Sequence, residues 1–135
     1  MFENFLKRKI TKQFIRFCLV GTEITIFSYI VFISLFYFLR VNYIISAGIG
    51  FIAGILLGFV FNKLWTFESR ERAITSLPKY FLVYTFTLFF TMVSIYFLVE
   101  KGKLNPLLSN FILQPFIILI NFFGTKVFAF KNFEW

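Results

Sequence analysis

The sequence contains no histidine, no aspartate and a single cysteine among its 135 residues. Zinc sites, disulfide frameworks and cysteine–histidine nucleophile pairs therefore lack the side chains that they need. Charged residues make up only 15% of the chain, whereas a soluble domain usually carries about 25%. The composition thus argues against a small soluble domain and against most metal-dependent or nucleophilic enzymes.

Apolar and aromatic residues, by contrast, are abundant. Hydrophobic residues make up 59% of the sequence, 24 residues are phenylalanine, and the mean hydropathy is +0.83. The formal net charge is +8, but the apolar content is too high for a nucleic-acid-binding arm. Basic residues beside long apolar runs indicate contact with anionic lipids instead. The composition is that of a small integral membrane protein.

Four apolar runs are long enough to cross a bilayer, which takes about 20 residues of helix. Short polar connectors separate the runs, and Asn105-Pro106 is typical of a helix N-cap followed by a first-turn proline. We expect an all-α integral membrane fold whose four transmembrane helices form two tandem helical hairpins. The expected spans are about 17–39, 44–65, 80–99 and 107–128.

The basic residues are unevenly distributed between the two sides of these spans. Of the 14 lysine and arginine residues, eleven flank the two chain ends and the middle connector, and three lie on the other side. Because loops rich in positive charge stay in the cytoplasm, both termini are expected there. The segment 1–16 is expected to be either a basic cytoplasmic tail or an interfacial helix.

An offset of 63 residues aligns the two halves of the chain. Basic and aromatic residues coincide under this shift: Arg16-Phe17 with Lys79-Tyr80, and Lys63 and Trp65 with Lys126 and Phe128. We expect about 16–67 and 79–130 to be an internal repeat whose copies are related by an axis along the membrane normal. The alternative is that any two helical hairpins in a phenylalanine-rich chain look alike.

Glu23 is the only acid well inside an expected span, about 9 Å from its cytoplasmic end by helix rise. A charged group at this depth should face the protein interior and find a partner, and basic residues lie at similar depth on other spans. We predict a phosphate or lipid-headgroup site formed by Arg16, Glu23, Asn62, Lys63, Lys79 and Lys126. The alternative is that these side chains extend to the membrane interface.

Polar residues on the fourth span recur at intervals of four, seven and four, which places them on one helix face. Pro115 frees a backbone carbonyl beside them. The face offers hydrogen bonds to a hydroxyl-rich cargo, so we predict that it forms a sugar path; alternatively, its amides join neighbouring helices. The members are Asn110, Gln114, Asn121 and Thr125.

Small residues on the second span form a row at four-residue spacing, made of Gly50, Gly54 and Gly58. Such a row lets another helix approach closely. The packing partner is either another span of the same chain or a second copy in a homodimer.

These motifs, in this order and spacing, resemble the GtrA-like family over nearly the whole chain, as a single domain of residues 1–135. They are Gln13-Phe14-Ile15-Arg16-Phe17 running into Val20-Gly21, Asn62-Lys63-Leu64-Trp65-Thr66-Phe67, Lys79-Tyr80-Phe81, and Asn121-Phe122 with Lys126-Val127-Phe128. The chain departs from the family pattern in having lysine at 79 and 126, where arginine is common.

The resemblance implies a multi-pass protein of the bacterial cytoplasmic (inner) membrane. Such a protein flips a polyprenyl (undecaprenyl) phosphate-linked monosaccharide to the outer leaflet for glycosylation of a surface polysaccharide. The chain also looks like the teichoic-acid glycosylation branch. The expected partners are the lipid-linked sugar, anionic lipids and membrane glycosyltransferases, and nucleic acid is not expected.

Two other functions stay open. A small multidrug-resistance-like cation transporter also has four spans and one acidic residue in its first span. Glu23 is the acidic residue in the first expected span of this chain. The uneven charge distribution and the cationic cluster argue against it. The second alternative is a non-transporting membrane partner of a glycosyltransferase, for which the glycine row is the docking surface. No enzyme activity or cofactor is expected, because the sequence has no nucleophile–base pair, nucleotide loop or metal-ligand set.

Overall fold

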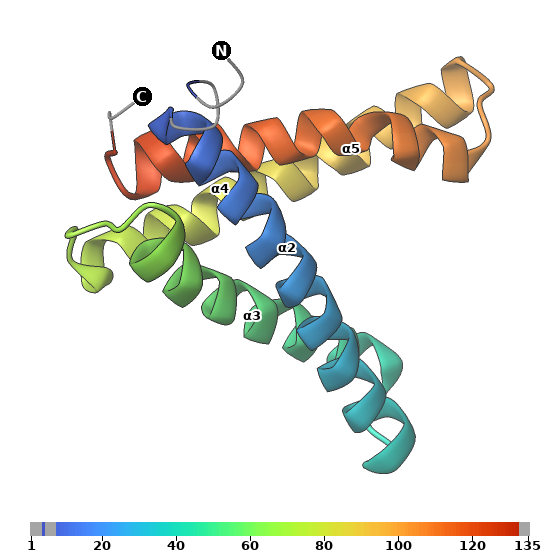
Figure 1. Cartoon of the computed structure of the whole chain (residues 1–135). Coiled ribbons are helices and arrows are strands. Elements are labelled where there is room, and N and C mark those ends of the chain that lie inside the picture. The colour runs from blue at the N-terminus through green and yellow to red at the C-terminus, as the bar shows by residue number, and fades with distance from the viewer. Residues whose placement is uncertain (1–3, 5–7, 133–135) are drawn as a thin grey trace. The chain divides into compact units, whose positions relative to one another are not determined.

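The computed structural model describes residue 4 and residues 8–132, and all regular structure within that part is helical (Figure 1). Four helices continue into short π-helical segments and are long and apolar enough to cross a membrane. This confirms the expected all-α fold with four spans. The elements are α2 (Lys9–Ile33), η1 (Ser34–Phe38), α3 (Tyr43–Phe61), η2 (Asn62–Thr66), α4 (Ala73–Tyr96), η3 (Phe97–Lys101), α5 (Pro106–Phe123) and η4 (Gly124–Ala129).

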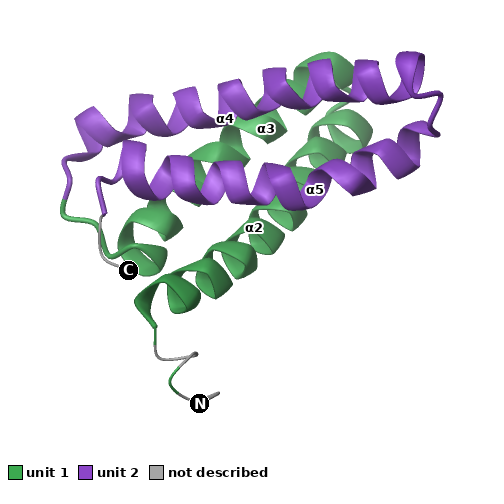
Figure 2. Cartoon of the chain, turned by 90° about the horizontal axis from the view of Figure 1, so that it is seen from above, with its two compact units in different colours: residues 1–70, 134–135 green, residues 71–133 purple. Residues whose placement is uncertain are grey.

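The chain divides into two compact units, coloured separately in Figure 2. Unit 1 contains α2 and α3, and unit 2, Glu71–Phe133, contains α4 and α5. Each unit is a helical hairpin, as expected. Part of the expected interfacial segment, residues 1–3 and 5–7, lies outside the described residues.

Helices α2 and α4 begin at Lys9 and Ala73, before the first residues of the expected spans. Hydropathy identifies only the apolar part of a helix, whereas backbone hydrogen bonding continues into the polar flank. In α4 the first turn is held by the hydroxyls of Thr75 and Ser76, which donate to the backbone oxygen of Arg72 at 3.0 and 2.8 Å.

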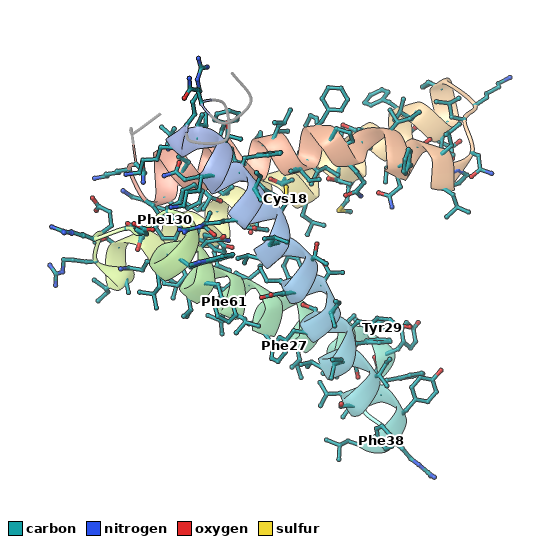
Figure 3. All side chains as sticks on the ribbon, viewed as in Figure 1. Cys18, Phe27, Tyr29, Phe38, Phe61 and Phe130 are labelled. Carbon is teal, nitrogen blue, oxygen red and sulfur yellow. The ribbon has the colours of Figure 1, made fainter. Side chains whose placement is uncertain are left out.

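Large apolar side chains remain exposed on the surface. Phe27, Tyr29 and Phe38, labelled in Figure 3, are 37%, 63% and 80% exposed. Exposed apolar surface of this extent is unusual in a soluble monomer and suits a lipid environment.

The glycine row packs α3 against α2 within unit 1. A Cβ atom at Gly50 would lie 2.9 Å from the backbone oxygen of Ser28, and one at Gly54 would overlap the Ser28 hydroxyl. Gly58 is also buried. A larger residue at Gly50 would press against the backbone of α2, and one at Gly54 would displace the Ser28 hydroxyl.

The turn between the two helices of each hairpin is capped by an asparagine. Asn42 Oδ1 accepts from the backbone N–H of Ile44 at 2.8 Å, and Asn105 Oδ1 accepts from that of Leu107 at 2.7 Å. Pro106 is the first residue of α5. The predicted Asn-Pro helix start is therefore confirmed.

Each of the four helices ends in the same way. Each π-helical segment is followed by its C-cap residue and then by a residue with a positive φ. The residue after that donates its N–H to a carbonyl six residues earlier in the chain. This pattern is a Schellman-type end, which usually has glycine at the positive φ. Here the four residues are charged: Arg40 (φ 54°), Glu68 (47°), Lys103 (53°) and Lys131 (47°).

Candidate functional site

In unit 1, Arg16 connects the early part of α2 to the turn after η2. Its Nη1 donates to the backbone oxygen of Trp65 at 2.7 Å and to Glu68 Oε1 at 2.9 Å. The guanidinium carbon lies 5.0 Å from the centroid of the Trp65 ring, a cation–π arrangement. We call Arg16, Lys63, Trp65, Glu68 and Ser69 the Arg16 cluster.

Glu68 has an exposed carboxylate within a local excess of positive charge. The hydrogen bond from Arg16 lowers the pKa of Glu68 below its ordinary value of 4.5, and Lys12 and Lys9 act in the same direction. Its side chain is 62% exposed. Glu68 is therefore negatively charged at neutral pH and serves as the counter-ion of Arg16.

In unit 2 a related arrangement occurs 63 residues later. Lys79 Nζ lies over the Phe128 ring, 5.7 Å from its centroid, much as the Arg16 guanidinium lies over the Trp65 ring. Lys131 stands at the position of Glu68 and has the same φ of 47°. We call Lys79, Lys126, Phe128, Lys131 and Asn132 the Lys79 cluster.

Both clusters adjoin an aromatic pair of similar geometry. The ring centroids of Phe17 and Phe67 lie 6.2 Å apart in unit 1, and those of Tyr80 and Phe130 lie 6.0 Å apart in unit 2. All four rings are buried. In each unit, this pair joins the first helix of the hairpin to the residue just before the positive-φ position.

Lys63 and Lys126 hold the turns that follow their helices. Lys63 Nζ donates to the backbone oxygen of Ser69 at 3.1 Å, and Lys126 Nζ donates to Asn132 Oδ1 at 3.1 Å. The backbone bonds run the other way, from Ser69 N to Lys63 O at 2.7 Å and from Asn132 N to Lys126 O at 2.8 Å. Lys126 is fully buried. These contacts give both lysines a turn-stabilising role.

The polar residues of the fourth span differ in their surroundings. Thr87 donates to Asn121 Oδ1 at 2.6 Å, which joins α4 to α5. Gln114 Nε2 donates to Asn110 Oδ1 at 3.1 Å, and both residues are exposed. Thr125 is buried, and its hydroxyl has no hydrogen-bond partner in the described part of the chain. Asn110 and Gln114 are thus accessible, whereas Asn121 has a structural contact.

Other predicted site residues have different neighbours from those expected. Glu23 is exposed on α2, and the acid that pairs with Arg16 is Glu68. Asn62 is buried and accepts a hydrogen bond from the Thr66 hydroxyl at 2.8 Å. Unit 1 thus brings together Arg16 and the turn held by Lys63, while Lys79 and Lys126 belong to unit 2.

Glu68 and Lys131 were not among the predicted site residues. The two copies of the expected repeat end at Phe67 and Phe130, one residue before them. Extending the 63-residue offset by one position places Glu68 opposite Lys131 and reveals the reversal of charge. That comparison is available from the sequence alone.

A family model described as the GtrA/DPMS transmembrane domain matches residues 16–130. No curated protein and no solved structure matches the chain. The matched region begins at Arg16 and ends at Phe130, so it contains α3, α4 and α5, the part of α2 from Arg16 onward, and both aromatic pairs. At the level of the family, the match supports a multi-pass membrane protein related to sugar translocation on carrier lipids.

Proposed function

We propose that this chain, which belongs to the GtrA/DPMS transmembrane-domain family, moves a polyprenyl phosphate-linked monosaccharide across the bacterial cytoplasmic membrane. The carrier is undecaprenyl phosphate, and the sugar serves glycosylation of a surface polysaccharide or teichoic acid. The protein acts as a transporter rather than as an enzyme.

The observation that carries this proposal is the cation placed over an aromatic ring in unit 2, where Lys79 lies over Phe128. Arg16 lies over Trp65 in unit 1, but it is already paired with Glu68. A lipid-linked sugar carries its negative charge where the acyl region meets water. A basic side chain at that depth binds the phosphate through charge-assisted hydrogen bonds, and the aromatic ring beside it remains in contact with lipid.

The accessible amides of α5 suit the sugar. Asn110 and Gln114 are exposed and bonded to each other at 3.1 Å, and both retain capacity for further hydrogen bonds. The sugar hydroxyls exchange water for these amides, while the polyprenyl chain stays in lipid. Asn121 and the buried Thr125, which lies in η4, continue the path toward the Lys79 cluster.

The charge distribution orients the protein. With eleven of the 14 basic residues at the chain ends and the middle connector, both termini lie in the cytoplasm. Both clusters then face the cytoplasmic leaflet, where the lipid-linked sugar is loaded. Anionic lipids of that leaflet are further partners of the basic flanks.

The experiment that tests the proposal uses purified protein in liposomes with a labelled polyprenyl phosphate-linked monosaccharide. Leaflet exchange with the purified chain alone supports transport. Exchange only after a glycosyltransferase is added would contradict it and indicate a partner protein. The glycine row no longer favours that alternative, because Gly50 and Gly54 pack within unit 1.

A further inference from the structure

We propose that the two clusters have different roles: Lys79 and Lys131 bind the phosphate group of a polyisoprenoid lipid, whereas Glu68 fills the equivalent position beside Arg16 as an internal anion. The choice of a lipid phosphate rests on the proposed function. The difference in charge is a property of the two hairpins themselves.

The equivalence of positions 68 and 131 is shown by the backbone around them. Both residues have a φ of 47°, and both follow a π-helical segment closed by the same pair of backbone hydrogen bonds. The bonds are Phe67 N to Asn62 O at 2.9 Å and Ser69 N to Lys63 O at 2.7 Å in unit 1, and Phe130 N to Thr125 O at 3.0 Å and Asn132 N to Lys126 O at 2.8 Å in unit 2.

Glu68 is the unusual member of the four positive-φ residues. The other three, Arg40, Lys103 and Lys131, are cations, which the partial negative charge at a helix C-terminus favours. An acid at this position is repelled by the same partial charge. The Arg16 guanidinium at 2.9 Å compensates for it. The carboxylate is therefore present because of Arg16 and not because of the helix end.

The ion pair of Arg16 and Glu68 shows where an anion lies relative to a cation that is placed over an aromatic ring. In unit 1 the carboxylate oxygen at that place belongs to Glu68. In unit 2 the cation over the ring is Lys79, and the position of the acid is taken by a second cation, Lys131. A phosphate group supplies negative charge between them and accepts hydrogen bonds from both ammonium groups.

The surroundings of Lys79 favour a phosphate attached to an apolar chain. Phe128, the ring beneath Lys79, is 48% exposed, so its open side is available to an isoprenoid chain. A free phosphate ion would gain nothing from that ring. We therefore assign the anion to the phosphate of a lipid.

The test measures binding of radiolabelled farnesyl phosphate to the full chain in nanodiscs of phosphatidylcholine. The wild-type chain is expected to bind one equivalent. Lys131→Glu should lower the affinity at least about 10-fold, because a charge-assisted contact is replaced by an internal ion pair. The matched control is Lys103→Glu, which makes the same change of charge at an exposed positive-φ residue of the same unit (φ 53°).

The reciprocal change is expected in unit 1. Glu68→Lys should raise the stoichiometry to two, whereas Glu100→Lys, the same change at another exposed position, should leave it at one. The double variant Glu68→Lys with Lys131→Glu should again bind one equivalent. This recovery of binding cannot come from a misfolded protein.

Equal affinities for Lys131→Glu and Lys103→Glu would overturn the assignment of Lys131, and a stoichiometry of one for Glu68→Lys would overturn the internal-anion role of Glu68. Displacement of the probe by an equal concentration of inorganic phosphate would overturn the lipid assignment. If binding follows the expected pattern but the wild-type chain moves no lipid-linked sugar, the proposed function fails and this inference stands. If the wild-type chain transports the lipid-linked sugar and Lys131→Glu changes neither binding nor transport, this inference fails and the proposed function stands.

Discussion

Arg16 and Glu68 form an ion pair of 2.9 Å across 52 residues of sequence. The shift of 63 residues that carries Arg16 onto Lys79 carries Glu68 onto Lys131. A complementary pair in unit 1 thus corresponds to two like charges in unit 2, although the turns that present them share the same backbone. This difference distinguishes the two hairpins and leads to the first prediction.

Glu68 should titrate below 4.5, and Arg16→Gln should raise its midpoint because the hydrogen bond from Arg16 is the main cause of the lowered pKa. The stabilisation from a lowered carboxylate pKa is present above the unfolded value and lost as pH falls through the folded one. Carbon NMR of the Glu68 carboxyl in micelles gives both midpoints. Lys103→Gln is the control. An unchanged midpoint in Arg16→Gln would show that the pair is not formed in solution.

Gly50→Ala should destabilise unit 1 by about 1–3 kcal/mol, as is typical of overpacking. Its Cβ would lie 2.9 Å from the backbone oxygen of Ser28, which cannot rotate away. Gly48→Ala is the matched control on the same helix, because a Cβ there meets nothing within 4 Å. Thermal unfolding in micelles compares the two. Equal melting temperatures would contradict the close packing of α2 on α3.

Gln114→Leu should reduce translocation of the lipid-linked sugar and leave the unfolding temperature near that of the wild type. Gln114 is exposed, and its bond to Asn110 lies within one helix. Asn121→Leu should lower both quantities, since it also removes the 2.6 Å bond to Thr87 between α4 and α5. Normal transport by stable Gln114→Leu protein would remove α5 from the sugar path.

Lys126→Gln should lower the unfolding temperature and leave the affinity for farnesyl phosphate close to that of the wild type. Its ammonium is buried against Asn132, and losing a hydrogen bond to a charged group costs about 1.5–3 kcal/mol. Lys79→Gln should show the opposite balance, with weaker binding and little loss of stability. Thermal unfolding and farnesyl phosphate binding are measured for both variants. A stable Lys126→Gln protein that no longer binds would place Lys126 on the phosphate.

Local patterns in the sequence were sufficient for the architecture. The length of each apolar run predicted the four spans, because crossing a bilayer depends on hydropathy summed along a helix. The start of α5 was predicted because Asn105 and Pro106 act on their own helix turn. The exact starts of α2 and α4 were missed, because helical hydrogen bonds extend beyond the apolar residues.

The partners of charged side chains could not be predicted in the same way. Hydropathy gives the depth of Glu23 in the span but not the direction in which the side chain points. Glu68 contacts Arg16 from a turn in which its own φ is positive, and neither its residue type nor its neighbours indicate that turn. The turn-holding contacts of Lys63 and Lys126 depend on the same turn geometry.

The central claim is tested most directly by the rate at which a labelled undecaprenyl phosphate-linked monosaccharide changes leaflet in proteoliposomes. The rate is measured for the wild-type chain, for Lys79→Gln, and for the control Lys101→Gln at the opposite end of unit 2, at matched protein content. We predict rapid exchange by the wild-type and control proteins and a rate at least about 10-fold lower for Lys79→Gln, from loss of one charge-assisted phosphate contact. Exchange by the wild-type chain no faster than in protein-free liposomes, or equal rates for all three proteins, would contradict the account.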